Sequence, residues 1–539
     1  MVGPTPTHVA RPAAREERAA NGKGRGSPWR TPLSVAAVLG VLALAIVLRA
    51  VPLTAKAPHP NYVDEPFVLE RSAHMIHERT LDPGWYRYPP LLAETTAVVT
   101  VAWGVVGGAE ADVGARRTVR SDAHGVIEPF TMILAGRLLT LAAGIGTVLL
   151  TMVLGGRLLG RWQGIAAGLL VAVLPALVTR SSIAIVDTPA TFFVMGALVA
   201  ASVMTTSPTA WRWAALAGIS SGLAFTSKYP AGAVVVAVLA LVAITPGWDR
   251  RRRLRLAAAQ VSAMVGAAVV SMPVLVTRTG AVLDDIRAQA EIYDAKTSDS
   301  YVDQLLRPRE VGAFLLVAAI VGVAVLVARP STRRFTLAWL AFVAVLLAFY
   351  LRTSYQPVRN LLPIVPFLII AAVAALDALA RLVERRIAVD PRATTVAMLI
   401  VVAGFAAWTV VDQSWPLQDD RNATADHRVD AREWLSDRVE ADDRVLVAEE
   451  LAFLPSELRR LDGEVTVASF LPRGRIPSAV SSLDVAGFDY VVTGRFVPGP
   501  EPGWNPSTLD APTLHLRGAR VRGLTSWTTN SPDIRVYER

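Results

Sequence analysis

Long apolar blocks separated by short polar segments constrain the fold of this chain more than any other feature. A helix needs about 20 mostly apolar residues to cross the hydrocarbon core of a bilayer. Blocks that approach this length lie at roughly residues 33–53, 131–154, 164–181, 188–204, 213–227, 229–246, 256–276, 310–328, 335–351, 360–380 and 394–412. Because 53% of the residues are hydrophobic and the mean hydropathy is +0.41, the chain is too apolar for an ordinary soluble enzyme. The sequence predicts a polytopic α-helical membrane protein with about 11 transmembrane helices.

Arginine clusters predict how these spans are oriented. With eleven spans and the N-terminus inside, the short loops that carry arginine clusters face the cytoplasm, as the positive-inside rule requires. The strongest cluster runs from Arg250 to Arg253. Residues 90–108 are also apolar, but a crossing there would turn this cluster outward, so we expect them to lie in the outer interface or to re-enter the membrane. The clusters explain the net charge of +9 better than nucleic-acid binding does.

The spans divide the chain into three regions. Residues 1–32 lack an apolar period and predict a disordered cytoplasmic tail. Residues 33–412 form the membrane domain, whose first outer loop, 54–130, would contain interfacial helices. Residues 413–539 predict a small extracytoplasmic α/β domain, because strand-like runs follow a helical segment at 431–439. These runs are residues 444–448, 465–469 and 489–493.

Several chemistries are excluded by what the sequence lacks. There is no cysteine, which rules out disulfides and thiolate catalysis. No phosphate-binding Walker loop, dinucleotide fingerprint or zinc-protease motif is present. Four lysines stand against 50 arginines, a bias typical of a GC-rich, bacterial genome. A second outer loop, residues 277–309, is polar and could be a mobile lid or a plain connector.

Three acids at the predicted outer membrane boundary are candidates for catalysis. Asp64 and Glu65 follow the first span, and Asp187 precedes Thr188-Pro189. Each could simply cap a helix, since Asp and Glu favour the first helical turn. Alternatively, carboxylates at a membrane surface can act as a general base with an orienting partner.

Cations gather at the same boundary, against the positive-inside trend. Arg137, Lys228 and Arg359 lie at the outer ends of spans, where ionisable groups are costly and often functional. They could reach lipid headgroups, or they could bind an anionic lipid phosphate together with the nearby acids. His74 and His77 could share a helix face, but no third ligand is evident, so a divalent metal is the weaker hypothesis and we expect no cofactor.

Several short motifs occur in the order found in one enzyme family. An outer-loop Asp64-Glu65, the Pro-Pro-Leu after Tyr88, Arg137, the pair Arg180 and Asp187, and Gly-Leu-Ala-Phe-Thr-Ser-Lys228 follow one another. The segment Tyr355-Gln-Pro-Val-Arg-Asn-Leu-Leu-Pro-Ile-Val-Pro366 completes the set. Residues 33–412 resemble the GT-C glycosyltransferases of the protein O-mannosyltransferase family (family 39) and their relative that moves aminoarabinose onto lipid A.

This resemblance implies a sugar donor on a polyprenyl phosphate and assigns roles to the candidates. Asp64 matches the family's proposed base, Glu65 its neighbour, and Asp187 the second acid, while Arg137 and Lys228 match positions near the lipid phosphate. The family often has His or Lys before Pro-Pro-Leu, where this chain has Tyr88. Arg87 could supply the missing cation, or the donor or acceptor differs. Arg359 is a further candidate for the phosphate, and Arg180 and Tyr88 for substrate binding.

We therefore expect a metal-independent, inverting glycosyltransferase of the plasma or inner membrane. Asp64 would take a proton from the acceptor hydroxyl, and the cations would stabilise the departing phosphate. The acceptor could be a protein, a glycolipid or a polysaccharide, and the sugar is open. A transporter or flippase of lipid-linked sugars is the main alternative, but its polar groups should lie near mid-bilayer in repeated halves. A sensing domain on an inert anchor is the weakest alternative.

Overall fold

The computed structural model describes most of the membrane domain and part of the C-terminal domain. The described residues are 31–55, 57, 59, 64–107, 130–294, 298–387, 389–423, 426–448, 451, 453, 458, 461–468, 487–495, 512–516 and 532–538. The predicted tail at 1–32 lies almost entirely outside them, as do His124 and the side chain of His77.

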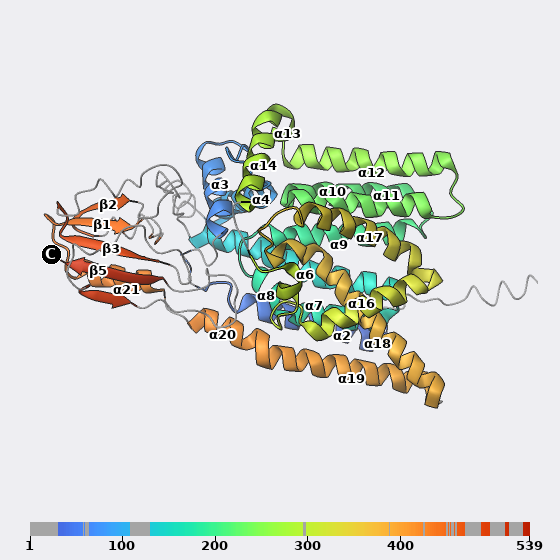
Figure 1. Cartoon of the computed structure of the whole chain (residues 1–539). Helices are drawn as coiled ribbons and strands as arrows, with labels where there is room; N and C mark the ends of the chain where they lie inside the picture. The colour runs from blue at the N-terminus through green and yellow to red at the C-terminus, as the bar shows by residue number, and fades with distance from the viewer. Residues whose placement is uncertain are drawn as a thin grey trace, which may run out of the picture.

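A bundle of long helices forms the larger part of the molecule (Figure 1). Within the described residues its members are α2 (Pro32–Ala50), α6 (Phe130–Leu158), α7 (Arg161–Val173), α9 (Asp187–Met204), α10 (Ala210–Ser227), α11 (Val234–Ile244), α12 (Arg250–Ser271), α16 (Ala313–Ala328), α17 (Pro330–Tyr350), α18 (Val365–Ile387) and α19 (Pro391–Thr409). Each predicted span coincides with one of these helices. Seven helical segments in the described part are long and apolar enough to cross a membrane. The predicted fold class is thus confirmed, while the count of eleven crossings stays a prediction.

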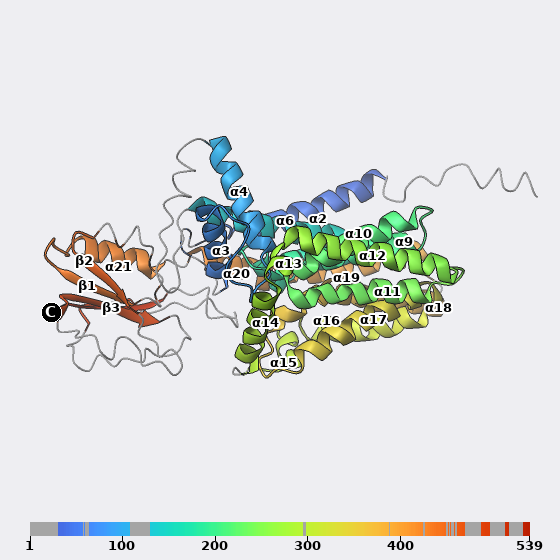
Figure 2. The same cartoon turned by 90° about the horizontal axis from the view of Figure 1, so that it is seen from above.

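Short helices gather at the end of the bundle that faces the C-terminal domain (Figures 1 and 2). They include α3 (Glu65–His77), α4 (Leu91–Gly107), α8 (Pro175–Arg180), α13 (Val274–Thr277), α14 (Thr279–Asp294) and α15 (Tyr301–Leu305). In Figure 2, α4 projects sideways from this end of the bundle, which is compatible with the interfacial placement predicted for residues 90–108. Residues of the segment 277–309 form α14 and α15 at this end of the bundle.

Aspartate and proline set the starts of several helices. Asp249, Asp390 and Asp426 each accept a hydrogen bond from the backbone N–H of a residue in the first turn of α12, α19 and α21 (His427–Ser436). This bond satisfies an amide that has no partner within the helix. Proline at the first or second position of α2 and α17 fixes a helical φ and needs no such bond.

The helix that leads toward the outer end is broken between α7 and α8. Pro175 has no N–H, so the carbonyl of Val171 loses the hydrogen bond that a continuous helix would supply. The buried guanidinium of Arg49 on α2 donates instead to the carbonyls of Val171 and Ala172, at 3.2 and 2.8 Å. Ser414 donates to the carbonyl of Val173 at 2.5 Å. Side chains from α2 and from the segment that follows α19 therefore stabilise this break.

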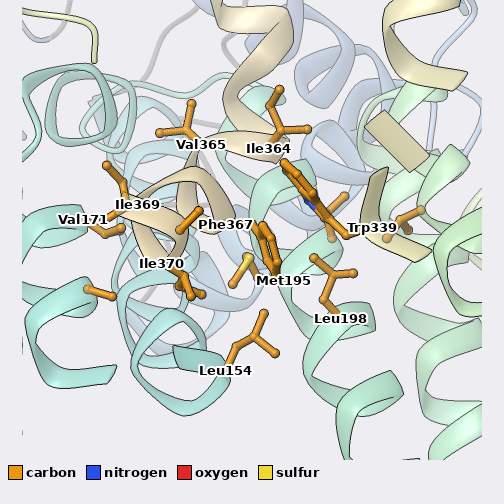
Figure 3. Packing of buried hydrophobic residues seen from close by; sticks show 14 of the residues in the cluster. Leu154, Val171, Met195, Leu198, Trp339, Ile364, Val365, Phe367, Ile369 and Ile370 are labelled. Atoms are coloured by element: carbon orange, nitrogen blue, oxygen red, sulfur yellow. The ribbon is translucent and has the colours of Figure 1, made fainter. Parts of the chain in front are cut away.

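The bundle core lies between α6, α7, α9, α17 and α18 (Figure 3). The Trp339 ring stacks on Phe367 with centroids 4.3 Å apart, and Met195 and Leu198 of α9 pack nearby. Close helix approach depends on small residues. At Gly322 on α16, a Cβ atom would lie 1.7 Å from the carbonyl oxygen of Ala371 on α18, so no larger residue fits.

The C-terminal domain contains a five-stranded sheet with the order β2-β1-β3-β5-β4. β1 pairs in parallel with β2 and β3, and β5 pairs antiparallel with β3 and β4. Helix α21 packs on the sheet through Ala431 and Leu435. The strands are β1 (Arg444–Ala448), β2 (Glu464–Ala468), β3 (Tyr490–Arg495), β4 (Leu514–Leu516) and β5 (Asp533–Glu538). The α/β class and the first three strands are confirmed, whereas β4 and β5 were not predicted.

Candidate active site

The start of α3 meets the 3-10 helix η2 (Val358–Ile364) at the end of the bundle nearest the C-terminal domain. Asp64 precedes α3 but does not cap it: its side chain accepts no hydrogen bond from the first turn. Instead its Oδ2 lies 2.8 Å from Nη1 of Arg359, and both side chains keep a small exposed fraction, 15% and 10%. The geometry therefore argues against the helix-cap role of Asp64, and its catalytic role stays a prediction.

A second acid and cation pair belongs to the same part of the molecule. Asp187 is the first residue of α9, yet its carboxylate accepts from Nζ of Lys228 at 2.5 Å and makes no cap. Lys228 follows the last residue of α10 and also donates to Oδ1 of Asn360 at 2.8 Å. The amide of Asn360 in turn donates to the hydroxyl of Tyr301 at 3.2 Å. Asn360 follows Arg359 directly, so η2 joins the two pairs.

Tyr88 links the two pairs electrostatically. Burial raises the pKa of the Tyr88 hydroxyl well above its ordinary value, and the carboxylates of Asp64 and Asp187 act in the same direction while Arg359 opposes them. Burial likewise raises the pKa of Tyr293 on α14, which is influenced by the same charges. Tyr88 is therefore a neutral hydrogen-bonding group in the site. It does not replace the cation that the resemblance led us to look for.

Glu65 and Arg137 form a buried ion pair with each other. Both side chains are 0% exposed, and the guanidinium binds the carboxylate through two bonds of 2.8 and 2.9 Å. Arg137 also donates to the carbonyls of Leu53 and Ala55, and Glu65 accepts from the backbone N–H of Ala184. This buried geometry favours a structural role for the pair. The roles predicted for Arg137 at the lipid phosphate and for Glu65 beside the base stay predictions.

Arg180 and Arg87 are the remaining predicted site residues. Arg180 binds Glu310 through two bonds of 2.9 Å, and both side chains are mostly buried. Arg87 is more accessible, with 33% of its side chain exposed, and its Nε lies 3.9 Å from Asp285 on α14. Arg180 and Arg87 thus stay predicted candidates for substrate and phosphate binding.

Metal binding finds no support in the part of the chain that the structure describes. No group of three or more His, Asp and Glu side chains could hold an ion there. The side chain of His77 lies outside the described residues, so the possible pairing of His74 and His77 at a metal stays a prediction.

Three residues of the candidate site were not predicted from the sequence. Asn360 belongs to the motif that contains Arg359, but its amide side chain carries no charge that would identify it as a site residue. Tyr301 and Tyr293 come from the segment 277–309, for which the sequence left a lid and a plain connector open without marking these two residues. The signal that could have found them is the concentration of tyrosine at residues 293, 301, 350 and 355, all close to the outer boundary.

Solved structures with the same arrangement of helices reveal the fold. ArnT from Cupriavidus metallidurans bound to undecaprenyl phosphate matches with a TM-score of 0.58 and 16% identity, over 93% of this chain and 97% of that chain. The archaeal oligosaccharyltransferase AglB from Archaeoglobus fulgidus, in complex with an inhibitory peptide and a dolichol-phosphate, matches with a TM-score of 0.53 and 12% identity, over 86% and 70%. The chain has the GT-C glycosyltransferase fold.

A sequence-family comparison agrees with this GT-C fold. Residues 130–276 match the family model described as dolichyl-phosphate-mannose-protein mannosyltransferase. The matched segment contains Arg137, Asp187 and Lys228. No curated protein sequence matches the chain. The resemblance that the sequence motifs predicted is confirmed.

Proposed function

We propose that this protein transfers a sugar from a polyprenyl-phosphate carrier to an acceptor hydroxyl at the outer face of a membrane. The observation that carries the proposal is the pairing of Asp64, a partly accessible carboxylate, with Arg359, beside a second acid and cation pair on a GT-C fold. A base that can reach solvent and a cation that can reach an anion are the two groups that this reaction requires.

The donor class rests on the relatives and on the available cations. ArnT was solved with undecaprenyl phosphate and AglB with a dolichol-phosphate, which supports a polyprenyl carrier here. Arg359 and Lys228 keep about a tenth of their side chains exposed, so either can reach a phosphate by a small movement. Arg87 is a candidate for a later or outer contact with the same phosphate.

The proposed reaction exchanges one bond at the anomeric carbon. The acceptor oxygen attacks that carbon from one face, and the bond between carbon and phosphate oxygen breaks with its electron pair on the phosphate. Asp64 receives the acceptor proton and later releases it to water. The products are the glycosylated acceptor, with inverted configuration, and polyprenyl phosphate. Because negative charge grows on the leaving phosphate, Arg359 and Lys228 would stabilise the transition state more than the ground state.

Donor binding would prepare the base. Asp64 and Asp187 balance Arg359 and Lys228, so an entering phosphate competes with the carboxylates for the same cations. When Arg359 turns toward the phosphate, its charge holds the Asp64 carboxylate less strongly, and that carboxylate becomes a better proton acceptor. The same exchange makes the phosphate a better leaving group.

The location of the site favours an enzyme over a flippase. Asp64 precedes α3, which lies with α14 at the bundle end nearest the C-terminal domain (Figure 1), whereas transporter sites lie near the bilayer midplane. The acceptor would reach the site from this side as a protein, a glycolipid or a polysaccharide. We expect the reaction to proceed without a metal or another cofactor.

The test compares Asp64→Asn with wild type in proteoliposomes, using radiolabelled polyprenyl-phosphate sugars and crude envelope as acceptor. Removing a general base should lower the transfer rate by about 10²–10⁴-fold. Asp284→Asn is the matched control, because Asp284 is exposed on α14 and pairs only locally with Arg287. Wild-type turnover by Asp64→Asn would contradict the proposal. Movement of the labelled lipid between leaflets without transfer would support the flippase instead.

A further inference from the structure

Three aromatic rings form a compact cluster one helical turn away from Asp64. Phe67 of α3 stacks on Trp85, with centroids 5.5 Å apart and planes inclined by 15°. Tyr88 lies 5.6 Å from Trp85 and 6.3 Å from Phe67. All three side chains are half-buried and so retain accessible surface. Because the rings pack on one another, the cluster offers an incoming molecule the apolar surface that these contacts leave exposed.

Charged side chains surround these rings. The guanidinium groups of Arg71 and Arg87 lie 5.8 and 5.9 Å from the centroid of Trp85. Arg71 is paired with Glu70, and Arg87 approaches Asp285. Two cations and two carboxylates leave the border of the cluster close to electrical neutrality while providing many hydrogen-bonding atoms.

The loop that carries Trp85 and Tyr88 is fixed in place through Tyr86. Its backbone N–H donates to Asp285 at 2.6 Å, its hydroxyl donates to Asp82 at 2.7 Å, and its carbonyl accepts from Tyr229 at 2.7 Å. Burial and the hydrogen bond to Asp82 raise the pKa of Tyr86 to about 12, so the hydroxyl keeps its proton. A surface held by this many bonds loses little entropy when a ligand binds.

We propose that Phe67, Trp85 and Tyr88 form the acceptor subsite, and that the acceptor is a neutral sugar ring of a glycan. This inference rests on the proposed function, because it places the acceptor of that reaction. Sugar rings have C–H faces that pack on aromatic rings and hydroxyl edges that need hydrogen-bonding groups. The cluster supplies aromatic surface for the C–H faces and, at its border, hydrogen-bonding groups for the hydroxyl edges, next to the proposed base.

The position of Tyr88 connects the subsite to the chemistry. Its ring centroid lies 6.3 Å from that of Phe67 on α3, the helix that Asp64 precedes. A ring packed on Trp85 and Phe67 would therefore place a hydroxyl in the direction of Asp64. Phe67 follows Asp64 by three residues, and residues at that spacing lie on the same side of a helix.

A peptide or a free anion fits this surface less well. Extended peptides are usually recognised by a sheet edge or a groove that binds the main chain. The elements next to the cluster are α3, α14 and the loop between α3 and α4, and none of the described strands belongs to them. A free anion would require excess positive charge, which Glu70 and Asp285 cancel.

The test measures binding directly, so it does not depend on transfer. Purified protein in nanodiscs is titrated with neutral oligosaccharides of glucose, mannose, galactose and arabinose, with Ser- and Thr-containing peptides, and with inorganic phosphate. We expect saturable binding of at least one oligosaccharide and at least a tenfold weaker affinity for Trp85→Ala, which is about 1.4 kcal/mol. Trp85→Phe should lie between the two. Trp408→Ala is the matched control, because this tryptophan is half exposed on α19.

Each outcome decides between the proposals. If Trp85→Ala still binds undecaprenyl phosphate, the variant is folded and its sugar affinity can be interpreted. If it no longer binds this lipid, Trp85→Phe decides instead: weaker sugar binding supports the subsite and unchanged sugar binding overturns it. Binding of no oligosaccharide, or equal binding by the Trp85 variants and wild type, overturns the subsite. Preferential binding of peptide or phosphate overturns it in favour of that ligand. Sugar binding by wild type without any transfer would leave the subsite standing and refute the proposed function.

Discussion

The buried pair of Glu65 and Arg137 should determine both the stability of the membrane domain and the arrangement of the active site. Through this pair, four segments meet: the loop after α2, the start of α3, helix α6 and the loop that leads to Asp187. Glu65 adjoins Asp64, and Ala184 precedes Asp187 by three residues. Any change that loosens the pair should therefore move both candidate acids.

The expected magnitude follows from the burial of the two groups. Glu65→Gln leaves Arg137 charged at 0% exposure and places an amide N–H₂ opposite a guanidinium donor. Removing one partner of a buried ion pair typically costs about 3–5 kcal/mol. Replacing both charges, in Glu65→Leu with Arg137→Met, should cost less than the two single changes together, because no charge is left buried without its partner.

The assay is a double-mutant cycle on purified protein, with unfolding followed in mixed micelles and transfer measured in parallel. We expect a coupling free energy of at least about 2 kcal/mol between the two positions. The single variants should also lose transfer, because the acids shift. Strict additivity would refute the structural role. So would a Glu65→Gln protein of wild-type stability that lacks activity, since that result would restore Glu65 to the catalytic machinery.

Two further predictions concern single residues. Asn360→Leu removes one of the two hydrogen bonds of Lys228. A hydrogen bond to a charged group is worth about 1.5–3 kcal/mol, so transfer at saturating donor should fall by roughly 10–150-fold, and an unchanged rate would contradict the network. Glu94 on α4 is buried, its Oε1 has no hydrogen-bond partner, and burial raises its pKa to about 8. Its folded pKa exceeds the unfolded value of about 4.3, so its stabilising contribution is complete below about pH 4, falls as the pH rises and is lost above about pH 8. Glu94→Gln should abolish this decline, which at 1.36 kcal/mol per pKa unit amounts to at most about 5 kcal/mol. If the unfolding free energies of wild type and Glu94→Gln change by the same amount between pH 5 and pH 9, this role of Glu94 is refuted.

The membrane domain was predictable because its main signal is local. An apolar block of sufficient length must become a helix in a bilayer, whatever its neighbours are. The outer positions of Asp64, Asp187, Lys228 and Arg359 followed from the order of the spans. Their meeting could be expected from that shared boundary, although which acid pairs with which cation could not.

Adjacent residues illustrate the limit of sequence reasoning. Asp64 and Glu65 look equivalent in the sequence, but successive helical residues point about 100° apart, so one side chain reaches the site and the other the protein interior. Which one does so depends on Arg137 and Arg359, both far away along the chain. Strand β5 shows the opposite case: Ile534 and Val536 alternate with polar residues, a period-two pattern that was present in the sequence but not used.

The side chains that stabilise the break between α7 and α8 determine where the chain can be divided into fragments. Helix α19 continues through a π-helical turn, η3 (Val410–Ser414), into α20 (Trp415–Ala423), so a cut at residue 412 would fall inside a continuous helix. Ser414 and Gln418 lie beyond that cut, and their side chains bond Val173 and Thr179 on the segment that leads to Asp187. Residues that belong to the C-terminal part by sequence thus serve the membrane part by structure. A fragment meant to retain the intact site must extend at least through α20, and a domain exchanged between relatives must be joined after it.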